Sequence, residues 1–283
     1  MELQRGDNDN AAIWGGTSAV RAPEFTVMAL QSRLHSIGLY SDSLDGIFGP
    51  NTEKALKIFQ WCLKHAVYVM KEDILADYSP SVDTELNGRC GSSTRSMLET
   101  WFENQYISTG DLVRVSTAEL SNIQLSPMFS QIGGPVVDRG EFLIARAAAP
   151  MIGHMNAFAS ELDLVVSINQ SLRILGSEVR GAVVKPATRS QHYIGHAVDC
   201  NRVDGDTWNT TSDFRNKTQT ANADRFILAM RNAGYRWGGD FSRTDPPHFD
   251  SQIDAQSFDY DAKVFLNQKQ ISAGEPIEKL PVQ

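Results

Sequence analysis

Apolar residues recur at helical spacing in the first hundred residues of the chain. Two stretches place them at intervals of three and four, which predicts two amphipathic helices, the first ending at Gly38. The apolar positions are Val27, Leu30, Leu34 and Ile37 in the first stretch, and Ala55, Leu56, Phe59 and Leu63 in the second. Gly46 and Gly49 lie between the stretches and indicate a tight turn there.

This turn-and-helix pattern occurs twice. Six positions of the first copy, two of them glycines, recur 42 residues later. Leu44, Gly46, Gly49, Thr52, Leu56 and Phe59 correspond to Leu86, Gly88, Gly91, Thr94, Leu98 and Trp101. Such agreement predicts two copies of one unit that together close a small three-helix core, separated by an insertion at 68–82.

The second half of the chain mixes helical and strand patterns. An alanine-rich segment at 140–164 carries an apolar stripe and predicts a long helix, and the β-branched run at 164–174 predicts a strand. Further helices are expected at 221–233 and 258–266, and short strands at 235–237 and 248–250. These elements favour an α+β chain, in which a three-helix module precedes an α+β domain with a small antiparallel sheet.

Changes in composition divide the chain further. Residues 1–23 are polar and aperiodic and are expected to form a flexible arm. The three-helix module then occupies 24–104, a linker 105–138, the second domain 139–270, and a polar tail interrupted by proline 271–283.

Charge and cysteine content exclude several classes of protein. The net charge of −8, with no long basic run, argues against nucleic acid and anionic membranes as partners. No apolar run is long enough for a transmembrane helix, and the N-terminus lacks the basic and apolar regions of a standard secretory signal. Three widely spaced cysteines provide neither a disulfide framework nor a thiolate metal site.

Two polar stretches carry the candidate chemistry. The first is SQHYIGHAVD at 190–199, and the second is WGGDFSRTDPPHF at 237–249. His192, Asp199 and His248 offer two nitrogens and one oxygen, a set that suits a catalytic Zn²⁺ with one position left open. Zinc would polarise a scissile carbonyl and acidify a water.

The remaining roles follow from the chemistry of such a site. Asp245 is the candidate group for taking the proton from the attacking water and passing it to the leaving amine. Arg180 is preferred over Lys185 and Arg189 as the positive partner of the oxyanion or of a substrate carboxylate. Ser190 is expected to orient His192 or to contact substrate.

Neighbouring residues are assigned lesser parts. Trp237 is expected to line the cleft, and Asp240 to orient His248. His196 is expected outside the ligand set, and Cys200 is expected to pack away from the metal because neighbours on a strand face opposite ways. His154 fits a structural role on its helix.

The two stretches resemble the LAS metallopeptidases, the zinc D-Ala-D-Ala carboxypeptidases and dipeptidases and the L-alanyl-D-glutamate endopeptidases. The SxHxxGxAxD signature matches at 190–199, and the family's second block matches WGGD and DPPHF. The resemblance covers about residues 140–252 and implies zinc ligation by His192, Asp199 and His248, with Asp245 as general base. Ser177-Glu-Val-Arg180 is similar to the family's SGYR, with Glu and Val in place of Gly and Tyr.

The first half resembles the peptidoglycan-binding family 1 module. The residues that carry this resemblance are Leu30-Gln31, Leu34, Gly38, Asp45-Gly46, Phe48-Gly49, Thr52, Ala55 and Phe59-Gln60. It covers about residues 24–104 and implies binding of peptidoglycan, although the insertion departs from the family.

Both resemblances imply the same polymer, so we expect a zinc-dependent peptidoglycan peptidase that acts at the cell wall. The WGGDF and DPPHF blocks favour an endopeptidase of the L-alanyl-D-glutamate or a related cross-bridge type. The alternatives are a D,D-carboxypeptidase and a non-catalytic peptidoglycan-binding protein. Without a signal sequence, the expected settings are a phage endolysin released through a holin, or an antibacterial effector with a secretion machine and an immunity protein.

Overall fold

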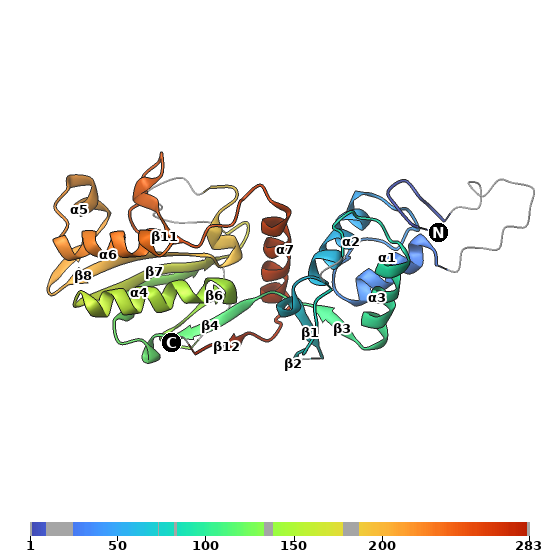
Figure 1. The fold of residues 1–283 in the computed structure, drawn as a ribbon, viewed down its shortest axis with the longest axis horizontal. Helices are drawn as coiled ribbons and strands as arrows, with labels where there is room; N and C mark the ends of the chain where they lie inside the picture. The colour runs from blue at the N-terminus through green and yellow to red at the C-terminus, as the bar shows by residue number, and fades with distance from the viewer. Residues whose placement is uncertain are drawn as a thin grey trace, which may run out of the picture. The chain divides into compact units, whose positions relative to one another are not determined.

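A computed structural model describes residues 2–9, 25–72, 74–81, 84–132, 138–177 and 187–281. The chain forms two compact units, Met1–Thr109 and Gly110–Gln283 (Figure 1). Within the described ranges, no helix is both long and apolar enough to cross a membrane.

The first unit is built on three helices, which confirms the predicted three-helix module. They are α1 (Val27–Ser36), α2 (Pro50–Cys62) and α3 (Ser92–Glu103). The insertion contributes a 3-10 turn, η1 (Ala66–Tyr68), and two strands, β1 (Val69–Lys71) and β2 (Ile74–Leu75). With β3 (Tyr106–Ser108) these strands form an antiparallel sheet in the order β2-β1-β3.

The two turns of the repeat are built the same way. Gly46 and Gly88 both have φ of +70°, a conformation that favours glycine, and each donates its N–H to a buried glutamine, Gln31 or Gln60. Each glutamine amide also donates to the side chain that precedes the glycine, Asp45 in the first turn and Asn87 in the second. The repeat therefore preserves a buried hydrogen-bonding pattern, and Asp45 serves the turn itself.

The expectation of a flexible N-terminal arm is wrong for residues 2–9. This segment forms backbone hydrogen bonds to both turns: Leu3 exchanges two with Cys90, and Phe48 donates to the Asp7 carbonyl. The carboxylate of Asp9 accepts from the N–H groups of Val27 and Met28, which caps α1. The segment is held because it satisfies backbone groups that the turns leave open. Residues 10–23 lie outside the described residues.

The second unit has a large mixed sheet and a small one. The large sheet has the order β10-β11-β8-β7-β5 with β9 on β8, and only β5 and β7 run parallel. Its strands are β5 (Ile123–Ile132), β7 (Leu164–Arg173), β8 (Ala197–Asp204), β9 (Thr207–Asn209), β10 (Arg236–Trp237) and β11 (His248–Asp250). The small sheet, in the order β12-β4-β6, contains β4 (Leu112–Ser116), β6 (Glu141–Ala145) and β12 (Glu278–Lys279).

Among the described residues of this unit, four helices and several 3-10 turns accompany the sheets. The helices are α4 (Ala149–Glu161), α5 (Thr211–Asn216), α6 (Ala221–Asn232) and α7 (Phe258–Ser272). The turns are η2 (Thr117–Glu119), η3 (Arg146–Ala148), η4 (Gln191–Ile194) and η5 (Gly238–Asp240).

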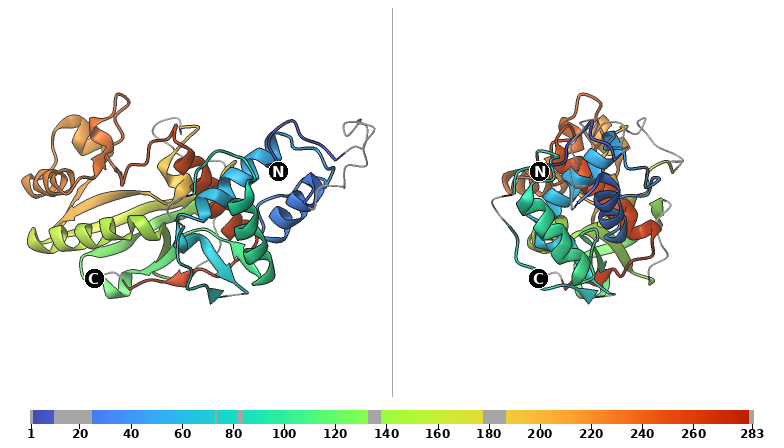
Figure 2. Two further views of the ribbon diagram at one scale, coloured as in Figure 1. Left: turned by 45° about the vertical axis from the view of Figure 1, so that its right-hand side comes forward. Right: turned by 90° about the vertical axis from the view of Figure 1, so that its right-hand side faces the viewer.

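The core of the second unit lies on one face of the large sheet, where α4 and α6 pack (Figures 1 and 2). Val198 and Cys200 of β8 belong to this core together with Met155 of α4 and Phe226 of α6. Because successive side chains of a strand alternate between faces, Asp199 points to the opposite face. The core thus fixes the strand whose other face carries the candidate ligand.

Three expectations about this half differ from the structure. The helix predicted at 140–164 begins only at Ala149, because residues 141–145 form the buried strand β6 that pairs with β4. The span 105–138 is not a linker, since β3, β4 and β5 lie within it and the units divide at Thr109. Parts of the tail from 271 are ordered, because α7 runs to Ser272 and β12 pairs with β4.

Candidate metal centre

The first polar stretch turns sharply and then enters β8. The 3-10 turn η4 carries His192 and is followed by Gly195, whose φ of +71° lies in the left-handed region. A Cβ at Gly195 would approach the backbone nitrogen of Ala145 to 2.7 Å. Both the backbone conformation and the lack of space therefore require glycine at this position, and the turn brings His192 and Asp199 to one place.

The second polar stretch reaches the same place through sheet pairing. Strand β11 pairs with β8 in antiparallel register, and this register sets His248 opposite Asp199. Cys200 N–H donates to the Pro247 carbonyl at 2.9 Å and extends the contact. Two residues 49 positions apart thus become direct neighbours.

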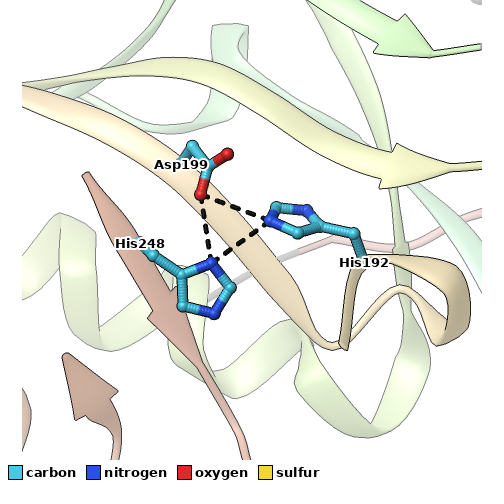
Figure 3. A group of neighbouring side chains, drawn as sticks. All are labelled: His192, Asp199 and His248. Carbon is cyan, nitrogen blue, oxygen red and sulfur yellow. Dashed lines mark hydrogen bonds and ion pairs between the residues drawn. The ribbon is translucent and has the colours of Figure 1, made fainter. Parts of the chain in front are cut away.

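The three predicted ligands converge (Figure 3). Nε2 of His192 lies 3.2 Å from Oδ1 of Asp199 and 3.2 Å from Nδ1 of His248, and this Nδ1 lies 3.1 Å from the same Oδ1. Donors at about 2.1 Å from a tetrahedral ion stand roughly 3.4 Å apart, so the spacing suits one small cation.

The outer nitrogens show which way the imidazoles present their lone pairs. Nδ1 of His192 donates to the Ser171 carbonyl at 2.6 Å, and Nε2 of His248 donates to the Asp250 carboxylate at 2.8 Å. With those nitrogens protonated, neutral imidazoles turn Nε2 of His192 and Nδ1 of His248 inward as acceptors. Two lone pairs and a carboxylate oxygen then face one another, an arrangement that a metal ion would satisfy.

The charges of the cluster shift the pKa values of Asp199 and His248. Burial by itself would raise the pKa of Asp199, but the neighbouring His192 and His248 hold it well below its usual range. Burial would lower the pKa of His248, yet hydrogen bonds and charge from Asp199 and Asp250 raise it to about 9. Without a metal, the inward nitrogen of His248 therefore binds a proton readily, and this proton competes with a metal ion for the same nitrogen.

Asp250 orients His248, whereas the sequence pattern had favoured Asp240 for this role. Asp250 is fully buried and accepts two hydrogen bonds from Arg236, both at 2.8 Å, besides the one from His248. Asp240 instead pairs with Arg231 at 3.1 Å, where both side chains are about half exposed. The signal was present: Asp250 follows His248 by two residues on one strand, so both face the same side.

Asp245 lies beside the ligands without belonging to their cluster. Its N–H donates to the Gly238 carbonyl at 2.8 Å, and its own carbonyl accepts from the N–H of His248 at 3.0 Å. Burial, together with the negative charge of Asp199, raises the pKa of its carboxyl. The nearby imidazoles and Arg173 oppose that rise.

Arg173 is a cation near the site that the sequence did not single out. It ends β7, is buried, and donates through Nη2 to Gln170, while its Nε has no hydrogen-bond partner among the described residues. Its charge acts on Asp245. The sequence offered one signal for Arg173: it lies near the end of the strand predicted at 164–174. Arg180 and Lys185 lie outside the described residues, and Arg189 contacts Asp261 and the Ala255 carbonyl.

The other singled-out residues have definite contacts. Oγ of Ser190 accepts the His192 N–H at 3.3 Å, and Nε1 of the half-buried Trp237 donates to the Pro246 carbonyl at 2.8 Å. His196 is buried outside the ligand set, with Nδ1 near Ser251, and burial lowers its pKa to about 4. Nδ1 of His154 contacts the Tyr235 hydroxyl.

All three cysteines are buried. Cys200 lies in the core, on the face away from the ligands, as its strand position predicts.

Two segments of the chain match known protein families. Residues 184–251 match the family described as D-alanyl-D-alanine carboxypeptidase, and this segment contains the three clustered side chains and Asp245. Residues 26–63 match the putative peptidoglycan binding domain, and this segment contains both turn-binding glutamines. The search among curated proteins gave no match.

Among solved structures, the chain is similar to ChiX, an L-Ala D-Glu endopeptidase of Serratia marcescens. The identity is 21%, over 36% of this chain and 77% of that one, with a TM-score of 0.28. A likeness this slight carries no argument. The two family matches confirm both resemblances seen in the sequence, and they support a metallopeptidase that acts on peptidoglycan and carries a peptidoglycan-binding domain.

Proposed function

We propose that this protein is a zinc-dependent peptidase that cleaves the stem or cross-bridge peptides of peptidoglycan. The observation that carries the proposal is the convergence of two imidazole lone pairs and one carboxylate oxygen beside a carboxyl group with a raised pKa. Three protein ligands are the number found in catalytic zinc sites, whereas structural sites are closed by four. The family match and the binding domain support peptidoglycan as the substrate.

His192, Asp199 and His248 would hold the ion. A zinc ion in such a site supplies Lewis acidity toward a carbonyl group and a water molecule. Ser171 and Asp250 fix the two imidazoles, because each accepts a hydrogen bond from the nitrogen that faces away from the cluster.

Asp245 serves as the general base and then as the general acid. It accepts a proton from the attacking water at its carboxylate and passes it to the nitrogen of the leaving amine. Its raised pKa suits the task of the base, because a carboxylate with a higher pKa takes up a proton more readily than an ordinary aspartate does.

Arg173 is the positive group that we assign to the substrate. Its buried guanidinium acts on Asp245 and keeps one N–H without a partner among the residues that the structure describes. A guanidinium so placed can stabilise the oxyanion or bind a substrate carboxylate. Arg180 is retained as the alternative on the sequence resemblance alone.

For the bond cleaved, we favour an endopeptidase of the L-alanyl-D-glutamate or a related cross-bridge type. The support is the WGGDF and DPPHF blocks, in which the base is Asp. The description of the matched family instead favours a D,D-carboxypeptidase that removes terminal D-Ala. In either case the binding domain raises the local concentration of substrate. We place the protein at the cell wall, as an endolysin released through a holin or as an effector with its secretion machine and immunity protein.

Digestion of purified sacculi tests the proposal. The protein is incubated with sacculi alone, with a chelator, and with a chelator followed by zinc, and the released muropeptides are identified by mass spectrometry. We expect new termini that disappear with the chelator and return with zinc. Release that ignores the chelator, or no release after zinc is restored, contradicts the proposal.

The position of the new terminus distinguishes the bonds. A free N-terminal D-glutamate residue indicates the endopeptidase, and loss of D-Ala alone indicates the carboxypeptidase. A third reading, a non-catalytic protein that only binds the wall, predicts that sacculi are bound and that a synthetic muropeptide is never turned over.

A further inference from the structure

Arg202 is a buried cation on the same strand as the ligand Asp199. Its side chain is fully buried, and the described part of the chain contains no carboxylate in an ion pair with it. Burial lowers the pKa of the guanidinium, and the charge of Asp224 opposes this shift only in part. A buried charge of this kind weakens the fold unless its contacts serve another purpose, and the contacts of its donors indicate that purpose.

The guanidinium is held between two rings and donates to two carbonyls. Its carbon lies 4.4 Å from the ring centre of Phe214 and 5.5 Å from that of Phe249. Nη1 donates to the Cys200 carbonyl at 2.9 Å and to the Pro246 carbonyl at 3.2 Å. Nη2 donates to the same Pro246 carbonyl at 3.3 Å. Both terminal nitrogens thus converge on the residue that follows Asp245.

The segment from Asp245 to His248 is fixed through its backbone. The Asp245 carbonyl accepts a hydrogen bond from the His248 N–H, and the Pro247 carbonyl accepts one from the Cys200 N–H. The Pro246 carbonyl accepts hydrogen bonds from the side chains of Arg202 and Trp237. The two prolines have no N–H to donate. The N–H of Asp245 donates to Gly238, where a Cβ would come within 2.2 Å of the Asp245 carbonyl oxygen.

The Asp245 side chain has no such support. Within the described ranges its carboxylate forms no hydrogen bond, and only charge and burial act on it. Its position therefore depends on the backbone that carries it. Side chains contact this backbone closest to Asp245 at the Pro246 carbonyl, which accepts from Arg202 and Trp237.

We infer that Arg202 is a positioning residue for catalysis, one that holds the Pro246 carbonyl and thereby the Asp245 carboxylate. The inference rests on the proposed function, in which Asp245 transfers the proton. Arg202 also links the strand that bears Asp199 to the segment that bears Asp245. It thus fixes the distance between a metal ligand and the base.

Arg202→Met separates this role from a merely structural one. Methionine has a similar volume and packs between the two rings without a charge, and replacing a buried charge in this way is often neutral or stabilising. We expect an unchanged or higher Tm, unchanged zinc content and KM, and a kcat lower by roughly 10²-fold, the cost of a displaced catalytic group. Arg225→Met is the matched control, since Arg225 is an exposed arginine of α6, and we expect no change in kcat.

Trp237→Phe provides the second test, because it removes the other side-chain donor to the Pro246 carbonyl. If both donors act through that carbonyl, the double variant loses less kcat than the product of the two single losses. Arg202→Lys keeps the charge but lacks the planar fork, and we expect its kcat to lie between those of wild type and Arg202→Met.

Amide hydrogen exchange keeps the inference testable apart from activity. In Arg202→Met we expect faster exchange in peptides that contain the amides of Asp245 and His248, and no change in β7. Wild-type kcat in Arg202→Met, or unchanged exchange of those peptides, overturns the inference. A loss of kcat that is accompanied by loss of zinc and a lower Tm also overturns it. A wild-type protein that never cleaves sacculi overturns the proposed function instead, and exchange then still decides whether Arg202 holds the segment.

Discussion

The two polar stretches of the site reach the same point by different means. In the first, His192 is fixed by hydrogen bonds that its own ring and backbone form with Ser171 and Ser190, and Gly195 provides the turn. In the second, Asp245 is placed by its backbone alone. The proposed ligand His192 is thus held at its side chain, whereas the proposed base Asp245 is held at its main chain.

This difference follows from what each group must do. A metal ligand keeps one orientation, so a hydrogen bond to the far side of its ring is an advantage. A general base exchanges a proton with water and with the leaving group, and a strong hydrogen bond to its carboxylate would hold its pKa low. Changes that loosen one of the proposed ligands should therefore affect the metal, and changes at Asp245 should affect turnover.

The largest expected effect is that of Asp245→Asn. The amide keeps the shape of the side chain but cannot accept a proton, so kcat should fall by roughly 10²–10⁴-fold. Zinc content, measured by elemental analysis, should stay at one per chain. If zinc is lost with activity, Asp245 is a ligand and the distinction between the stretches fails.

Asp250→Asn should have the next largest effect, because Asp250 fixes the His248 ring from behind. Loss of such a partner costs about 10–100-fold in metal affinity or activity. Competition with a chromogenic chelator measures the affinity. Asp240→Asn is the matched control, since Asp240 pairs with Arg231 away from the ring, and it should bind zinc as wild type does. Equal losses in both variants would show that the orienting role of Asp250 is wrong.

Gly195→Ala should reduce stability more than a second glycine variant does. Gly205 has φ of +56° and open space around it, so Gly205→Ala should cost only the backbone term, about 1–2 kcal/mol. At Gly195 the added methyl group also meets a backbone nitrogen that cannot move aside, so the cost should be larger. Urea unfolding of the two variants makes the comparison. Equal losses would mean that the turn tolerates the methyl group.

The last effect concerns the chelated protein. The folded state raises the pKa of His248 from 6.5 to about 9, so between these values the folded protein binds more protons than the unfolded chain. The stabilisation is complete below about pH 6.5 and is lost as the pH rises through about 9. Tm should therefore fall over this window in the presence of a chelator, and His248→Gln should remove the fall. A flat profile in the chelated wild type would contradict this account.

Sequence patterns served best where local chemistry decides the structure. The clustering of His192, Asp199 and His248 was predicted because a short motif fixes their spacing, and the glycine turns were predicted because left-handed backbone favours glycine. The fold of the first unit followed from its repeat.

The failures all involve partners that are distant in sequence. Phe142 and Ile144 were read as part of a helix, yet they belong to β6, because pairing with β4 outweighs local helix propensity. Arg173 went unnoticed because only the sheet brings the end of β7 to the site. Asp250 was passed over in favour of Asp240, although its alternation with His248 was visible.

The strap formed by residues 2–9 has a consequence for how the chain is made. Leu3 pairs with Cys90, and Asp7 and Asp9 bond to the turn around Gly46. Residues 2–9 are synthesised before the second turn, so they cannot complete these bonds until that turn has been made. These residues are therefore among the last in their domain to be secured, and the high sequence separation of this contact should slow the closing step of folding.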